Sequence, residues 1–206
     1  MTKEEILPYF EALHASLAIP VLYVSHDLSE IERLADRMVF LQSGRVVAAG
    51  PLNELLTDSH LPLMRGSEAS SVLETHVSAN NPGDGLSALV IDGATLLVRS
   101  RVGKAATLQR VRIAANDISL AVEAPSPTTI LNVVPVRVQD LYPLDDAQIN
   151  VMLTIGHREN GPKLLARITR RSQHALGFMR GQDVYAQIKA ITMVGPVPAT
   201  TIKADQ

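Results

Sequence analysis

The stretch VRIAANDISL at residues 111–120 recurs in similar form as VYAQIKAITM at residues 184–193. Two shorter stretches repeat in the same chain order, LVI at 89–91 with LTI at 153–155 and LLVR at 96–99 with LLAR at 164–167. From Ser71 onward, short β-branched segments are separated by Gly, Asn and Pro, which is typical of a small all-β barrel or sandwich. The repeat therefore predicts two similar β modules, joined at the Ala-Pro-Ser-Pro segment of residues 124–127.

Residues 1–56 have an α/β pattern instead. Their hydrophobic periodicity predicts, in chain order, a helix over 6–17, a strand over 21–24, a helix over 28–38, a hairpin over 38–49 that turns at Ser43-Gly44, and a short helix over 52–56. The predicted strand is continuously apolar, which suits a strand covered on both faces in a parallel sheet. Residues 57–70 lose this periodicity, which predicts a linker.

The composition of the 206-residue chain argues against several classes of function. Nineteen Lys and Arg against 21 Asp and Glu give a formal charge of −2, so there is no basic surplus to neutralise a phosphate backbone. With 3 Phe, 4 Tyr and no Trp, few side chains can stack on bases, which further disfavours an OB-type nucleic-acid binder. The absence of Cys excludes disulfides and thiolate zinc sites, and the histidines show no metal-like spacing. We therefore expect no nucleic-acid partner and no metal site.

His26 directly follows the predicted strand, at the end where open α/β sheets place groups that contact ligands. The segments VSHDLSE at 24–30, LADR at 34–37 and VFLQSGRV at 39–46, followed by Gly50-Pro51 and a helix, resemble the switch-histidine region of ABC-transporter ATPases. The resemblance implies that residues 1–56 are the C-terminal part of a P-loop ABC ATPase domain. It also implies that His26 is catalytic, contacting the γ-phosphate of ATP and helping to align the attacking water.

Other motifs of the ATPase family are missing from the sequence. A P-loop needs the pattern G-x-x-x-x-G-K-[ST], but the single Gly-Lys pair, Gly103-Lys104, is followed by Ala105. Neither a Leu-Ser-Gly-Gly signature nor an apolar run ending in Asp-Glu is present. We therefore expect that this chain does not hydrolyse ATP alone. The sequence does not decide whether it is part of an enzyme. It is similar to the C-terminal part of a longer subunit, in which ATP and Mg²⁺ would be the cofactors.

The second half of the sequence resembles another known module. The segments TTILNVV at 128–134, ARIT at 166–169 and VYAQIKAI at 184–191 resemble the molybdate-binding (Mop, or TOBE-type) module, an OB-like β-barrel. Residues 1–193 as a whole resemble the ATP-binding subunit of molybdate ABC importers. The implied organisation is an ATPase remnant at 1–56, a linker at 57–70, a first OB-like TOBE module at 71–124 and a Mop module at 128–195.

The resemblance to the Mop module also implies a ligand and its site. Carried over by motif, the oxyanion-binding residues are Thr129, Thr169, Ser172 and Lys189, with molybdate as the ligand. A dianion taken from water needs several donors and a compensating cation, so this set is chemically reasonable.

Two positions depart from the pattern of the family. Leu131 stands where many members carry Arg, and Ala190 stands where a hydroxyl is common. Lys cannot replace the bidentate donor that an Arg supplies, although Arg170 or Arg137 is a candidate substitute. The alternative is a β region that serves only as a structural or dimerising scaffold.

The resulting hypothesis is the C-terminal portion of the ATP-binding subunit of an importer for molybdate or tungstate, with a regulatory oxyanion-binding domain. In such an importer, the subunit pairs with a second copy of itself on the cytoplasmic face of the inner membrane. It is a peripheral subunit that drives membrane-spanning permease subunits, and a periplasmic molybdate-binding protein delivers the anion. The alternative is a freestanding cytosolic molybdate-binding storage or sensor protein. We also expect the incomplete α/β part to expose an apolar face.

Overall fold

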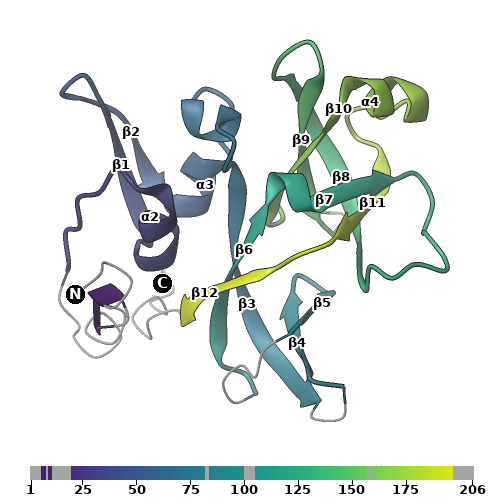
Figure 1. Ribbon diagram of the computed structural model, residues 1–206, viewed down its shortest axis with the longest axis horizontal. Helices are drawn as coiled ribbons and strands as arrows, with labels where there is room; N and C mark the ends of the chain where they lie inside the picture. Colours follow the sequence, from purple (N-terminus) through teal and green to yellow (C-terminus); the bar gives the residue numbers. More distant parts are fainter. Residues whose placement is uncertain are drawn as a thin grey trace.

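The computed structural model describes residues 6–7, 9–10, 20–81, 84–99, 105–156, 158 and 160–196. Figure 1 shows two curled β-sheets, with a small α/β part at one side. The α/β part consists of helix α2 (Leu28–Leu34), the antiparallel hairpin of β1 (Arg37–Gln42) and β2 (Arg45–Pro51), and the short helix α3 (Leu52–Leu56). The prediction of a mostly β region from Ser71 onward is confirmed by these two sheets.

Most of the elements predicted for the α/β part are present, but the second helix ends at Leu34 rather than at residue 38, because β1 already begins at Arg37. The hairpin turns at Ser43 and Gly44, both with positive φ (51° and 72°), as a tight hairpin turn requires. Asp27 is the N-cap of helix α2, and its carboxylate accepts a hydrogen bond from the backbone N–H of Ser29 at 2.9 Å. Residues 6, 7, 9 and 10 are helical, and the rest of the predicted first helix lies outside the described residues.

The predicted strand over residues 21–24 is wrong. The segment is extended but has no strand partner among the described residues, and Leu22 and Val24 are 90% and 83% exposed. A strand of a parallel sheet needs at least one paired strand and cover on both faces, and none of the described strands pairs with this segment. Among its described residues, the α/β part therefore contains one antiparallel hairpin and no parallel sheet. One face of this hairpin is exposed at Val39, Leu41 and Val46, in agreement with the apolar face predicted from the sequence.

Ten strands form the two five-stranded sheets. The N-terminal sheet has the order β12-β6-β3-β4-β5. Its strands, in this order, are β12 (Thr192–Pro196), β6 (Leu108–Ala114), β3 (Ser70–Asn81), β4 (Leu86–Ile91) and β5 (Ala94–Val98). The C-terminal sheet has the order β7-β11-β8-β9-β10. Its strands, in this order, are β7 (Ile118–Ala121), β11 (Asp183–Ile188), β8 (Asn132–Pro143), β9 (Gln148–Ile155) and β10 (Lys163–Thr169). Helix α4 (Arg170–Leu176) follows β10, and the 3₁₀ turns η1 (Pro62–Arg65) and η2 (Ala115–Asp117) precede β3 and β7.

Each sheet is completed by a strand from the other half of the chain. Strand β7, from the first half, pairs with β11 in the C-terminal sheet. Strand β12, from the last residues of the second half, pairs with β6 in the N-terminal sheet. Cleavage of the chain at residues 124–127 would therefore separate each sheet from one of its five strands.

The predicted internal repeat is confirmed by the order of the strands and by their irregularities. Strands β3 and β8 occupy equivalent places, and each carries a β-bulge at an equivalent position, between Val77 and Ala79 and between Val138 and Asp140. Near the start of each of these strands, a polar side chain forms a hydrogen bond to a strand of the other sheet. The Ser71 hydroxyl accepts from the backbone N–H of Leu165 in β10, and the Asn132 side chain bonds both the N–H and the carbonyl of Leu97 in β5.

A single hydrophobic cluster lies between the two sheets. It includes Leu89, Leu96 and Ile113 from the N-terminal sheet and Leu153 and Leu164 from the C-terminal sheet, each with no exposed surface. Burying each of these side chains stabilises the fold by about 1.5–3 kcal/mol. The exchanged strands therefore enclose one shared core rather than two independent ones.

Residues 57–70, the predicted linker, pack against the barrel. Leu61, Met64 and Ala69 in this segment are buried. The Asn150 amide donates to the carbonyl of Met64 at 2.7 Å, and Arg167 donates to the carbonyls of Met64 and Gly66. These bonds attach the segment that joins the two parts of the chain to strands β9 and β10.

Candidate functional site

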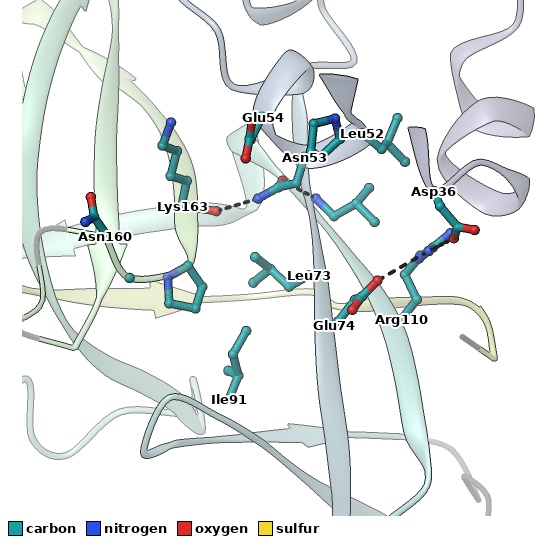
Figure 2. A pocket seen from close by; sticks show the side chains of 14 residues that line it. Asp36, Leu52, Asn53, Glu54, Leu73, Glu74, Ile91, Arg110, Asn160 and Lys163 are labelled. Atoms are coloured by element: carbon teal, nitrogen blue, oxygen red, sulfur yellow. Dashed lines mark hydrogen bonds and ion pairs between the residues drawn. The ribbon is translucent and has the colours of Figure 1, made fainter. Parts of the chain in front are cut away.

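The α/β part meets the N-terminal sheet across a cleft of about 710 Å³. Figure 2 shows Asn53 of α3 beside Lys163 and the pair Glu74 and Arg110 on the opposite wall. The Asn53 side chain accepts from the backbone N–H of Val72 at 2.9 Å and donates to the carbonyl of Lys163 at 3.4 Å. One amide therefore attaches α3 to strands of both sheets.

Two ion pairs, each with one buried member, hold the α/β part on strand β6. The Arg110 guanidinium, whose side chain is 5% exposed, bonds the carboxylate of Asp36 and the carbonyl of Ala35. The Arg112 guanidinium bonds Glu32, whose side chain is 1% exposed, and the Ser70 hydroxyl donates to the same carboxyl group. Each buried charge thus has a partner of opposite sign, and removing either partner would leave an uncompensated buried charge.

Burial raises the pKa of the Glu32 carboxyl above its ordinary value of 4.5, against the lowering effects of the Ser70 hydroxyl and of Arg112. A raised pKa means that the folded state binds the proton more readily than the unfolded state does. The contribution of Glu32 to stability is therefore largest at low pH and is lost as the pH rises through the raised pKa.

We expect this dependence on pH to disappear in Glu32→Gln. The melting temperature of the wild type minus that of Glu32→Gln should become more positive as the pH falls from about 8 to about 5. Thermal denaturation followed by circular dichroism at a series of pH values measures this difference. A difference that stays constant, or that changes in the opposite direction, contradicts the raised pKa.

His26 is exposed, and no hydrogen bond or ion pair joins its ring to another described residue. It lies between the extended segment and α2, where Tyr23 and Ser25 both donate to the Glu30 carboxylate. The backbone N–H of Asp27 donates to the Ser25 hydroxyl at 3.1 Å. These bonds fix the backbone on both sides of His26 and leave its imidazole available to solvent.

Thr169 and Ser172 lie together at the start of α4. The Thr169 hydroxyl accepts from the backbone N–H of Ser172 at 3.0 Å, and the two hydroxyl oxygens are 2.8 Å apart. Thr169 is thus the N-cap of the helix. Both side chains are exposed, so each hydroxyl retains room for a further hydrogen bond.

Lys189 and Thr129 are exposed and lie at the other end of the C-terminal sheet. The backbone N–H of Lys189 donates to the carbonyl of Asp117 at 2.8 Å. The residue before it, Ile188, pairs with Asn132 at the start of β8, which places Lys189 next to the chain that carries Thr129. Thr169, by contrast, pairs with Gln148 near the far end of β8.

A single chain therefore does not bring the four sequence-predicted residues together. The 12-residue strand β8 separates the two pairs by roughly 35 Å of extended chain. Leu131, at the position of the missing Arg, is 62% exposed on the end that carries Lys189. The candidate substitutes are engaged elsewhere, since Arg137 forms a bidentate pair with Asp183 and Arg170 donates to the carbonyl of Asp145.

Arg167 is a buried residue that sequence reasoning did not assign to a site. Burial lowers the pKa of its guanidinium, while the nearby Asp145 carboxylate acts in the opposite direction. The motif ARIT led to the choice of Thr169 as a site residue. The pattern of polar and apolar residues along β10 did not predict that Arg167, two residues earlier, is buried. Its acceptors come from the segment predicted to be a linker.

Comparison with known proteins first defines a class. The TOBE domain family matches residues 128–192, and none of the described helices is long and apolar enough to cross a membrane. The β region also resembles the cytoplasmic molybdate-binding protein ModG, in a crystal form with molybdate bound. The TM-score is 0.53 with 19% identity, over 61% of this chain and 96% of that one. The chain therefore contains a TOBE domain with an OB-like fold.

Curated relatives then narrow the class. Molybdenum import ATP-binding proteins ModC of Rhodopseudomonas palustris strain BisB18 and of Rhodobacter capsulatus are 46% and 43% identical to this chain. The matches cover 94% and 95% of this chain, and 51% and 54% of those proteins. The chain is thus a close homologue of molybdenum import ATP-binding subunits, and it spans about half the length of the curated relatives it matches.

Proposed function

We propose that this chain acts as the C-terminal portion of the ATP-binding subunit of a molybdate importer, with β modules that bind the oxyanion and regulate uptake. The observation that carries the proposal is the alignment of 94% of the chain with molybdenum import ATP-binding proteins. The OB-like fold that it shares with a molybdate-binding protein supports the oxyanion-binding role of the β region.

The oxyanion site is composed of residues from two copies of the chain. Thr169 and Ser172 of one copy supply hydroxyl donors, and Thr129 and Lys189 of the other supply a hydroxyl and a cation. This arrangement follows from the separation of the two pairs along β8, together with the exposure of all four side chains. A dianion that leaves water needs both the donors and the positive charge. Binding of molybdate is thereby coupled to association of the β modules.

The α/β part is, in this proposal, the remnant of a P-loop ATPase domain. The exposed Leu22, Val24, Val39 and Leu41 would be covered by the half of the relatives that this chain does not span. His26 would contact the terminal phosphate of ATP, and Mg²⁺ would be held by residues of that other half. The complete subunit would lie on the cytoplasmic face of the inner membrane against permease subunits, with a periplasmic protein delivering molybdate.

Isothermal titration calorimetry tests the oxyanion-binding role. We expect saturable binding of molybdate at micromolar or lower concentration, weakened about tenfold or more in Lys189→Ala and in Thr169→Ala. Lys163→Ala, which removes an exposed lysine outside the proposed site, is the matched control and should bind like the wild type. Parallel titrations with tungstate and sulfate report selectivity. The absence of heat with all three anions leaves the β region as a dimerisation scaffold and refutes the proposal.

A freestanding molybdate-binding protein is the second candidate, because the ModG match covers 96% of that chain. The mass of the native polypeptide in its source cells separates the two candidates. A species near 40 kDa that reacts with antibodies to this chain supports the importer subunit, whose relatives are about twice as long. A species of 22.2 kDa supports the freestanding protein.

A further inference from the structure

A second pocket, of about 520 Å³, lies where the segment after η1 meets the beginning of β9. Its lining is mainly polar and comprises Arg65, Ser67, Asn116, Leu144, Asp145, Gln148 and Arg167. It shares no residue with the proposed Thr129, Thr169, Ser172 and Lys189 site. The segment of its wall that carries Arg65 and Ser67 connects the α/β part to the β modules.

Arg167 supplies a buried cation to this pocket. Its Nε donates to the Asn150 side-chain oxygen at 2.9 Å, and its two terminal nitrogens donate to the carbonyls of Gly66 and Met64 at 2.9 and 3.0 Å. All three acceptors are neutral. Among the residues that the structure describes, no carboxylate lies within ion-pair distance of this guanidinium, although the residue is only 8% exposed.

A buried charge is costly unless a charge of opposite sign compensates it. Arg167 has five N–H groups, and the three hydrogen bonds leave one on each terminal nitrogen without an acceptor among the described residues. Arg65, exposed on the same wall, adds a second cation. The single carboxylate of the lining, Asp145, uses one oxygen to accept from the N–H groups of Ala147 and Gln148. The lining therefore keeps a net positive charge.

We propose that this pocket binds a phosphate-type tetrahedral oxyanion. The buried Arg167 and the exposed Arg65 supply the two positive charges that contact it. The Ser67 hydroxyl and the Gln148 amide, which make no side-chain hydrogen bond to another described residue, supply the remaining donors. A bound oxyanion would link the connecting segment at residues 65–67 to β9 and β10. The chemistry is the same for a free anion and for a phosphate group carried by a nucleotide, and the volume admits either.

Binding of inorganic phosphate, sulfate and AMP to the full chain tests the proposal by titration calorimetry. We expect saturable binding of phosphate or AMP, with affinity reduced about tenfold in Arg65→Gln and in Arg167→Lys. Arg65 is exposed, so Arg65→Gln should keep the wild-type circular dichroism spectrum even if Arg167→Lys lowers stability. Arg45→Gln, at an exposed arginine of the hairpin, is the matched control and should bind like the wild type.

The outcomes separate this pocket from the proposed molybdate site. Phosphate affinity that is unchanged in Lys189→Ala but reduced in Arg65→Gln supports two independent sites. Binding of AMP without binding of phosphate supports the pocket with a nucleotide as the source of the oxyanion. The absence of saturable binding up to about 10 mM of any of the three, or an affinity that Arg65→Gln leaves unchanged, overturns the proposal.

Discussion

Residues 1–124 and residues 125–206, produced as two separate polypeptides, should each fail to show a cooperative thermal transition. The first lacks β12, which pairs with β6, and the second lacks β7, which pairs with β11. Each would also expose half of a hydrophobic cluster that spans both sheets. The loss of structure should be nearly complete, and circular dichroism with amide-proton NMR dispersion measures it.

Mixing the two polypeptides provides the control. Equimolar amounts should recover a cooperative transition, because the exchanged strands and the shared core are then available together. Cooperative folding of residues 125–206 alone would contradict the structure, since it would show that the C-terminal sheet is stable without β7. The same result would favour two independent modules, as the repeat in the sequence first suggests.

Arg112→Met should lower the free energy of unfolding by about 3–5 kcal/mol. The substitution leaves the carboxylate of Glu32, which is 1% exposed, without its cation, and only the hydroxyl of Ser70 then remains as a partner. Urea denaturation followed by circular dichroism measures the change. Hydrogen exchange should localise the loss to α2 and to β6, which carry the two partners.

The double variant Glu32→Gln/Arg112→Met identifies the cause. Removing the stranded charge should recover a large part of the lost stability, because the cost arises from an unpaired buried carboxylate and not from missing packing. Arg45→Met, at an exposed arginine on β2, should change stability by less than about 0.5 kcal/mol. A single variant that is no less stable than the wild type would show that the Glu32–Arg112 pair does not hold the α/β part in place.

Local patterns in the sequence predicted local structure well. The Ser43-Gly44 hairpin, α2 and α3 each depend on turn residues, caps and periodicity within a few positions. The repeat also indicated the equivalent strands, although the bulges and the hydrogen bonds along β3 and β8 align Val111 with Ala186 rather than Val184. Stretches of sequence report which face of a strand is buried, but they do not report which strand lies beside it. The exchange of β7 and β12 could not be read from them.

The candidate site was less predictable for the same reason. The segment of residues 21–24 has the composition of a buried strand, but composition does not supply a neighbouring strand, and none of the described strands pairs with it. The motifs placed Thr169 and Lys189 in one site, whereas the register along β8 separates them. Arg167 escaped notice because its partners, Met64 and Gly66, are about a hundred residues away in the chain and use only their backbone carbonyls.

The central claim is that molybdate binds between two copies of the chain. Thr169→Ala and Lys189→Ala each alter one of the two copies' contributions to every proposed site, so at a molybdate concentration that saturates only the wild type each variant alone should bind little molybdate. When the two variants are mixed, randomly formed mixed dimers contain one site with both sides intact. We predict that equilibrium dialysis of the mixture recovers about one quarter of the wild-type capacity for molybdate. A mixture that binds no more than the separate variants would contradict a site shared between two copies.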